Sequence, residues 1–168
     1  STIDCLSIAK PGAGGAGWWH QAMGVDVGKA ARGGGIRVGV IDTGCGPHPN
    51  LNHVTLVGAF VDGQALLVPN DARDVAEHGT HTTGIIGARP TKPSDYAGMA
   101  AGCDLFHARV FKGEGPTDGP TQADIINAID SLSRDHGCDL INMSLGGGPR
   151  SEAEEDAIRD AAERGTLC

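Results

Sequence analysis

Asp42 and His78 are a carboxylate and an imidazole that could act together in acid–base catalysis. An imidazole, whose ordinary pKa is about 6.5, accepts a proton at neutral pH when a carboxylate fixes its tautomer and stabilises the resulting cation. If Asp42 binds one ring nitrogen of His78, the other nitrogen can deprotonate a hydroxyl nucleophile. The residue types therefore predict general-base catalysis, with Asp42 orienting His78 and Thr43 holding the Asp42 rotamer.

Three segments must position this chemistry. GIRVGVIDTG is a run of branched apolar residues that predicts a buried strand over 36–42, with Asp42 at its carboxyl end. HGTHTTGIIG predicts a helix over 78–88 that begins at His78 and whose glycines permit close packing. CDLINMSLGGG predicts a second buried strand over 138–144 that runs into a glycine-rich segment.

The remaining elements continue an alternation of strand and helix. Apolar runs predict strands over 55–62 and 103–110, and helical periodicity predicts helices over 122–136 and 152–164. A short helix is expected around 18–23. Alternating strands and helices favour an α/β fold with a parallel sheet.

The order of Asp, His and Ser-Leu-Gly in these segments resembles the subtilisin family of serine endopeptidases, whose catalytic triad runs Asp, His, Ser along the chain. The resemblance implies a three-layer subtilisin-like α/β fold with a mostly parallel sheet. It also implies that Asp42 and His78 are catalytic. Ser144, Leu145 and Gly146 would bind an extended substrate along their backbone.

The same resemblance implies parts that these residues do not hold, namely an oxyanion-hole Asn and a Gly-Thr-Ser nucleophile turn. Gly165–Cys168 resembles the start of the strand that leads to that Asn. We therefore expect 1–168 to be the N-terminal part of a single peptidase domain, with 1–35 an extension packing on its body. The partners would be a peptide or protein substrate and a C-terminal remainder, in the same precursor or a second chain, and the chain alone would be inactive.

A second substrate-binding edge of the family corresponds to the loop Lys112–Gly115. The family often uses calcium, but the loop 89–97 has no run of Asn or Asp, and Asp95 is a lone candidate ligand. His78 and His81 have the spacing of a metal pair, yet no Glu follows His78 and no further ligands lie near. We expect no essential metal and no cofactor.

Other chemistry-bearing residues have structural interpretations. Trp18 and Trp19 are expected to anchor the N-terminal segment to the body. The five cysteines include no CxxC pair and are interpreted as small core residues. Four further histidines show no partner spacing and are expected at the surface or in loops: His48, His53, His107 and His136.

Composition excludes several classes of function. The 168 residues suit one domain, and the formal net charge of −8 leaves no basic surface for nucleic acid. No apolar run approaches the roughly 20 residues of a membrane span. We expect a soluble protein, either secreted after processing or cytoplasmic.

Two other functions stay open at this point. Gly12, Gly14 and Gly17 match the dinucleotide fingerprint G-x-G-x-x-G, after a candidate strand over 2–9 and with Asp42 as a ribose-binding acid. Glycines interrupt the helix that this hypothesis requires, and it leaves HGTH and INMSLGG unexplained. The other alternative is a catalytically inactive subtilisin-like module that binds a peptide or partner, because no nucleophile is present in these residues.

Overall fold

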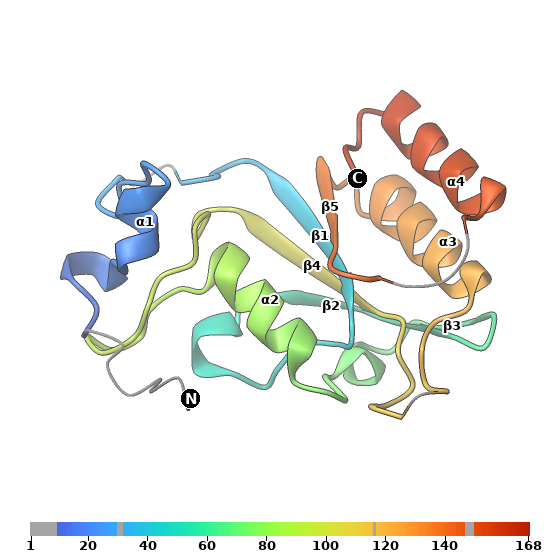
Figure 1. The fold of residues 1–168 in the computed structure, drawn as a ribbon, viewed down its shortest axis with the longest axis horizontal. Coiled ribbons are helices and arrows are strands. Elements are labelled where there is room, and N and C mark those ends of the chain that lie inside the picture. The colour runs from blue at the N-terminus through green and yellow to red at the C-terminus, as the bar shows by residue number, and fades with distance from the viewer. Residues whose placement is uncertain (1–9, 30–31, 116, 147–149) are drawn as a thin grey trace, which may run out of the picture.

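Five strands form one sheet in the part of the chain that the structure describes, in the order β3-β2-β4-β1-β5 (Figure 1). The structure is a computed structural model, and it describes residues 10–29, 32–115, 117–146 and 150–168. The strands are β1 (Arg37–Asp42), β2 (Thr55–Val61), β3 (Gln64–Leu66), β4 (Asp104–Arg109) and β5 (Leu140–Met143).

Strand β1 lies at the centre of the parallel part of the sheet. It pairs in parallel with β4 on one side and with β5 on the other, and β2 pairs in parallel with β4. Asp42 is in register with Arg109, and Ile41 with Met143. Because the carboxyl ends of parallel strands meet at one edge, the residues that follow β1 and β5 lie beside each other.

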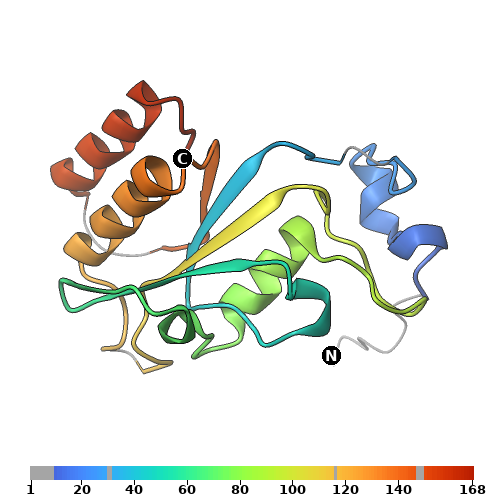
Figure 2. The ribbon, with the colours of Figure 1, turned by 180° about the vertical axis from the view of Figure 1, so that it is seen from behind.

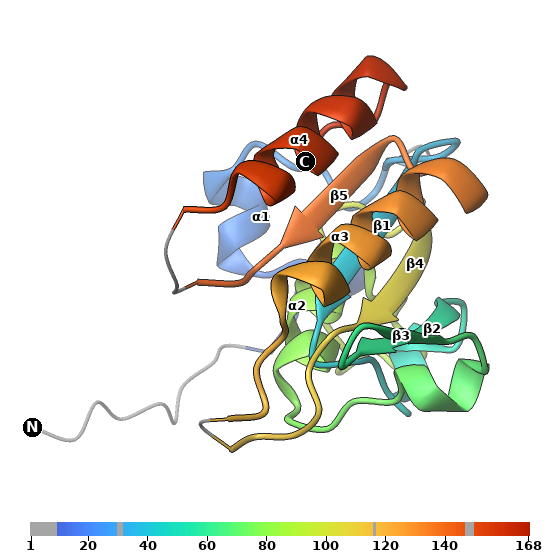
Figure 3. The same cartoon turned by 90° about the vertical axis from the view of Figure 1, so that its right-hand side faces the viewer.

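Helices cover both faces of the sheet (Figures 2 and 3). Helix α2 (His78–Gly87) covers the face that carries Val38, Val40 and Leu105, whereas α3 (Gln122–Asp130) and α4 (Glu152–Glu163) cover the opposite face. The predicted three-layer α/β fold is therefore confirmed.

The alternation of side chains along β1 explains these two layers. Successive residues of a strand point to opposite faces, so Val38 and Val40 pack under α2 while Ile41 joins the core beneath α3 and α4. Gly39 points to the latter face, where an added Cβ would lie 2.9 Å from a methyl group of Leu132. This glycine lets the helical layer approach the strand closely.

The predicted strands agree with the observed ones to within two residues at each end, and three of the predicted helices correspond to α1 (Trp18–Ala22), α2 and α4. The predicted helix over 122–136 is α3 up to Asp130, followed by a π-helical turn at Ser131–Asp135. Strand β3 was not predicted, because its three residues are all exposed and pair only with β2, in antiparallel orientation.

The described N-terminal residues contact the loop that follows α2. The Ala97 amide donates to the Gly15 carbonyl at 2.9 Å, and the Arg32 guanidinium donates to the Gly98 carbonyl at 3.0 Å. The Trp19 ring lies 4.8 Å from that of Tyr96, as expected of an anchor. Trp18 is 77% exposed, so the same expectation was wrong for Trp18.

None of the helices in the described residues combines the length and apolar composition needed to cross a bilayer.

Candidate active site

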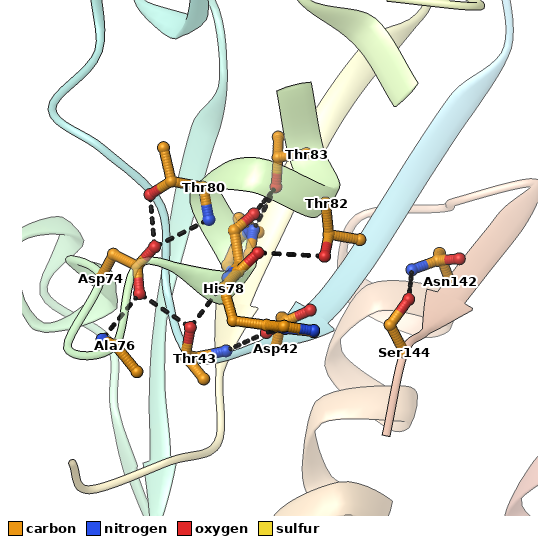
Figure 4. A network of polar contacts seen from close by, with 12 residues as sticks. Asp42, Thr43, Asp74, Ala76, His78, Thr80, Thr82, Thr83, Asn142 and Ser144 are labelled. Atoms are coloured by element: carbon orange, nitrogen blue, oxygen red, sulfur yellow. Dashed lines mark hydrogen bonds and ion pairs between the residues drawn. The ribbon is translucent and has the colours of Figure 1, made fainter. Parts of the chain in front are cut away.

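Asp42 and His78 meet at the carboxyl edge of the sheet. Asp42 is the last residue of β1 and His78 is the first of α2, and Asp42 Oδ1 lies 2.7 Å from His78 Nδ1 (Figure 4). The Asp42 side chain is fully buried, whereas that of His78 is 55% exposed. The bond through Nδ1 fixes the ring and leaves Nε2 as the nitrogen available to a hydroxyl.

This contact changes the acid–base behaviour of the imidazole. The hydrogen bond to Asp42, and then the Asp42 charge, raise the pKa of His78 above its ordinary value. An opposite charge in contact favours the protonated ring. The pair therefore stabilises the imidazolium that forms when His78 accepts a proton.

Thr43 holds the Asp42 carboxylate through its backbone. The Thr43 amide donates to Asp42 Oδ1 at 2.7 Å. Its hydroxyl, which we had expected to bind that carboxylate, instead donates to Asp74 Oδ1 at 2.7 Å and accepts from the Gly79 amide at 2.8 Å. The Thr43 hydroxyl is therefore occupied by the Asp74 carboxylate and the Gly79 amide, and it joins the end of β1 to the first turn of α2.

Asp74 organises the loop before α2, and the sequence interpretation missed it. Its carboxylate accepts from the Thr43 hydroxyl, from the Ala76 amide at 3.1 Å, and from both the amide and the hydroxyl of Thr80, the amide at 2.7 Å (Figure 4). Burial raises the pKa of Asp74, but the bonds from Thr80, Ala76 and Thr43 outweigh it, so the pKa lies below its ordinary value. Asp74 thus accepts from an amide in the first turn of α2. The signal in the sequence for this contact is an Asp placed four residues before His-Gly-Thr.

Glycines permit the contact between β1 and α2. A Cβ on Gly79 would lie 2.2 Å from the Gly44 carbonyl oxygen and 3.1 Å from the Asp42 Cβ. Gly44 itself has φ +117°, and a Cβ there would lie 2.4 Å from the Arg73 carbonyl oxygen. The helix can therefore begin against the end of the strand only with glycine at both positions.

Ser144, Leu145 and Gly146 follow β5 at the same edge of the sheet. Ser144 and Gly146 are exposed, and Leu145 is half-buried against the core. The side-chain Nδ2 of Asn142 donates to Ser144 Oγ at 3.0 Å. No hydrogen bond joins Ser144 to Asp42 or His78 in the described parts of the chain. Figure 4 shows Asn142, which is on β5, and Ser144, which follows β5, apart from the Asp42–His78 pair.

The loop that holds Lys112–Gly115 closes on itself. The Lys112 amide donates to the Asp118 carbonyl at 2.9 Å, and the Gly115 amide donates to Asp118 Oδ2 at 2.9 Å. Its expected role as a second substrate-binding edge stays a prediction. Asp95, the candidate calcium ligand, accepts hydrogen bonds from the amides of Thr91 and Lys92.

The expectation that His107 lies at the surface was wrong. Its side chain is fully buried on β4, and its Nδ1 lies 3.0 Å from Thr83 Oγ1 on α2. Burial lowers the pKa of His107 to about 4. The signal that predicts its burial is its place between Phe106 and Ala108, inside a mostly apolar run of the kind expected for a strand covered on both faces. The other histidines of that group lie as expected, His48 exposed and His53 and His136 half-buried.

The expected burial of the cysteines holds for most of those described. Cys45, Cys103 and Cys138 are buried free thiols, whereas Cys168 is exposed. Cys5 lies outside the described residues.

Comparison with known proteins identifies the family. Residues 33–168 match the Subtilase family, a match that covers most of the chain and includes Asp42, His78 and Ser144. The chain belongs to the subtilase family. The chain is 33% identical over 135 residues to the thermophilic serine proteinase of Bacillus sp. (strain AK1), covering 79% of this chain and 31% of that protein. It is 34% identical over 143 residues to the major intracellular serine protease of Bacillus subtilis (strain 168), covering 83% and 43%.

The solved structures give the same result. Sphericase superposes with a TM-score of 0.69 at 28% identity, over 80% of this chain and 44% of its own. This subtilase chain thus spans less than half the length of each of these three proteins. The family gives no support to the dinucleotide-binding alternative. Gly12, Gly14 and Gly17 lie in or beside the 3-10 turn Ala13–Gly15, and the helix that follows has five residues.

Proposed function

We propose that this chain is the N-terminal part of a subtilase peptidase domain, spanning 1–168 with 1–35 as an extension packed on its body, that hydrolyses peptide bonds through an acyl-enzyme. Asp42 orients the base and His78 is the base. The observation that carries the proposal is the 2.7 Å bond between buried Asp42 Oδ1 and His78 Nδ1.

The chemistry follows from this tautomer. His78 Nε2 takes the proton of a serine hydroxyl while the serine oxygen bonds to the substrate carbonyl carbon. The imidazolium gives that proton to the leaving amine as the C–N bond breaks, which leaves an ester. A water molecule, deprotonated by the same base, then hydrolyses the ester. Asp42 stays ionised throughout and stabilises the cation.

Ser144, Leu145 and Gly146 would bind the substrate through their backbone. An extended peptide adds to an exposed strand edge by main-chain hydrogen bonds, which need an accessible backbone rather than particular side chains. Ser144 and Gly146 are exposed, and a Cβ on Gly146 would meet no atom within 4 Å. Both features support this role.

The serine nucleophile and the oxyanion-hole Asn would come from a C-terminal remainder, in the same precursor or a second chain. One support is that the chain spans less than half of its relatives. A second is that the Ile141 amide donates to the Leu167 carbonyl at 2.7 Å, in a parallel bridge between Leu140 and Leu167. Residues after such a bridge would run beside β5 toward the edge that holds Asp42. Residues 1–168 alone would be inactive.

A serine-reactive phosphonate probe tests the proposal on the complete protease. We expect covalent labelling of the complete protein, loss of labelling in His78→Ala, and retained labelling in His81→Ala. His81 is the matched control because it is exposed on the same helix. Absence of label on the wild-type protein at any probe concentration would contradict an enzyme and favour a binding module.

A further inference from the structure

A histidine that the proposed mechanism does not use lies beneath the helix that carries His78. His107 is on β4, in register with Val40 of β1, and its side chain is fully buried. It shares the face of β4 with Leu105, which packs under α2. An apolar side chain would fill this space without the cost of burying an imidazole. The presence of His107 there calls for a polar role.

The contacts of Thr83 define the state of His107. Thr83 is fully buried on α2, and its Oγ1 lies 2.6 Å from the Gly79 carbonyl oxygen and 3.0 Å from His107 Nδ1. A hydroxyl has one proton, which the short bond directs to the Gly79 carbonyl. Oγ1 must then accept from Nδ1–H of His107. Nδ1 of His107 therefore carries a proton. Its buried Nε2 has no partner among the described residues, which favours a neutral ring without a proton on Nε2.

The hydrogen bonds of His107 and Thr83 lead to Gly79, the residue that follows His78. The Gly79 carbonyl is tied through Thr83 to His107 of β4, and the Gly79 amide is tied to the Thr43 hydroxyl at the end of β1. His107 of β4, through Thr83, and Thr43 after β1 thus both hold the first turn of α2. The position of His78 relative to Asp42 depends on this turn.

We propose that His107 is a positioning residue for the reaction, which acts through Thr83 to hold the first turn of α2 and with it the His78 imidazole against Asp42. This role rests on the proposed function.

Burial keeps His107 neutral in the folded protein and lowers its pKa. Two carboxylates face the His107 ring, that of Asp42 from β1 and that of Asp74 from the loop before α2. Both charges raise the pKa of His107, but burial lowers it by more. The Cys45 thiol beside Thr83 is neutral, since burial raises its pKa to about 11. The nearby Arg109 guanidinium donates to the carbonyls of Asp71 and Phe111.

The sign of the pH effect follows. The pKa of His107 falls from 6.5 to about 4 on folding, so below 6.5 the unfolded chain binds a proton that the folded chain does not. His107 therefore lowers the free energy of unfolding progressively as pH falls from 6.5 to about 4, and has no such effect above 6.5.

Substitutions of His107 in the complete protease test the proposal. His107→Leu fills the space but donates no hydrogen bond, whereas His107→Asn offers an amide N–H near the place of Nδ1 and does not titrate. We expect His107→Leu and Thr83→Val each to lower kcat by about ten- to a hundredfold with KM unchanged. The double variant should lower kcat no further than either single one. His107→Asn should restore most of the loss, and Leu105→Met, on the same face, should leave kcat unchanged.

Wild-type kcat in His107→Leu, or equal losses in His107→Asn and His107→Leu, would overturn the proposal. Two measurements do not depend on activity. In both His107 variants stability should fall less between pH 6.5 and about 4 than in the wild type, and amide exchange over Gly79–Thr83 should be faster in His107→Leu than in His107→Asn. If the wild-type enzyme takes no phosphonate label, the proposed function fails, but the exchange and stability measurements still decide whether His107 holds the helix. Amide exchange and acid stability in His107→Leu equal to those of the wild type would show that it does not.

Discussion

At the scale of single residues, the bond between Asp42 and His78 makes the charge of the imidazole depend on its partner. The hydrogen bond and charge of Asp42 raise the pKa of His78, so the ring is protonated, and unable to act as a base, up to a higher pH than an isolated histidine. Activity should therefore rise with pH through the raised pKa of His78. The acid limb of the pH–rate profile reports this pair.

Replacing Asp42 by Asn in the complete protease tests the pair directly. The amide favours the wrong tautomer of His78 and removes the charge that stabilises the imidazolium, so we expect kcat to fall by about ten-thousandfold with KM almost unchanged. The acid limb of kcat/KM should move to lower pH, because the hydrogen bond to the Asp42 carboxylate and its charge, the two largest causes of the raised pKa of His78, are gone. Peptide hydrolysis measured across pH checks both effects, and near-normal turnover would refute the assignment of Asp42.

Asp74→Asn should lower stability. The folded-state pKa of Asp74 is depressed, so its ionised form contributes stability above the unfolded-state value of 3.8 that is lost as pH falls through the folded pKa. The Asn NH₂ would also face the amides and hydroxyls that now donate to the carboxylate. We expect a loss of about 1–3 kcal/mol at neutral pH that shrinks toward pH about 3.

Urea unfolding at these two pH values provides the measurement. Asp71→Asn is the control, since it removes a carboxylate three residues earlier whose charge acts on Arg109, and in the described residues no hydrogen bond to that carboxylate is lost with it. An equal loss at both pH values would show that the charge of Asp74 contributes nothing.

The sequence predicted the residues that stand in short motifs and missed those defined by where a side chain points. Asp42 and His78 could be located because a strand end and a helix start each fix one side chain in space. The partners of the Thr43 hydroxyl and of His107 depend on how the loop of Asp74 and helix α2 sit against the sheet. No local pattern contains that information.

At the scale of elements, α2 is the helix whose packing decides the geometry of the site. Gly79→Ala improves helix propensity but places a methyl group 2.2 Å from the Gly44 carbonyl oxygen. We expect the clash to destabilise the fold by about 1–3 kcal/mol and to abolish most activity by displacing His78. Thermal unfolding and kcat are the measurements.

Gly84→Ala is the control on the same helix, because a Cβ there meets no atom within 4 Å. It should stabilise the protein by about 0.5–1 kcal/mol and leave kcat unchanged. Equal behaviour of the two variants would show that the contact between Gly79 and Gly44 does not position the helix.

Elements with periodic burial were predictable and others were not. Strand β1 alternates between two covered faces, and α3 carries an apolar stripe after the Thr121 cap, whose hydroxyl accepts from the Asp124 amide. Strand β3 has no buried residue to create a pattern. The π-helical turn after Asp130 continues the buried face of the helix, with Leu132 following Ile129 in the core, so the apolar pattern carries no signal for the change of winding.

At the scale of the whole molecule, the structure predicts a gradient of local stability. Strands β1 and β4 are paired on both sides and largely buried, whereas β3 is an exposed edge strand. Amide hydrogen exchange should be slowest over Val38–Ile41 and Leu105–Ala108 and fastest over Gln64–Leu66. Exchange measured by mass spectrometry tests this order, and equal protection of β3 and β1 would contradict it.

The four described cysteines are all free, and three of them are shielded by the core. Burial raises the pKa of Cys45 to about 11 and that of Cys138 to about 12, so their thiolates are scarce at neutral pH. Cys168 is the exposed one, one residue beyond the bridge to β5. A thiol reagent should therefore modify Cys45 and Cys138 only when the core around them opens, so the rate of their modification measures local unfolding.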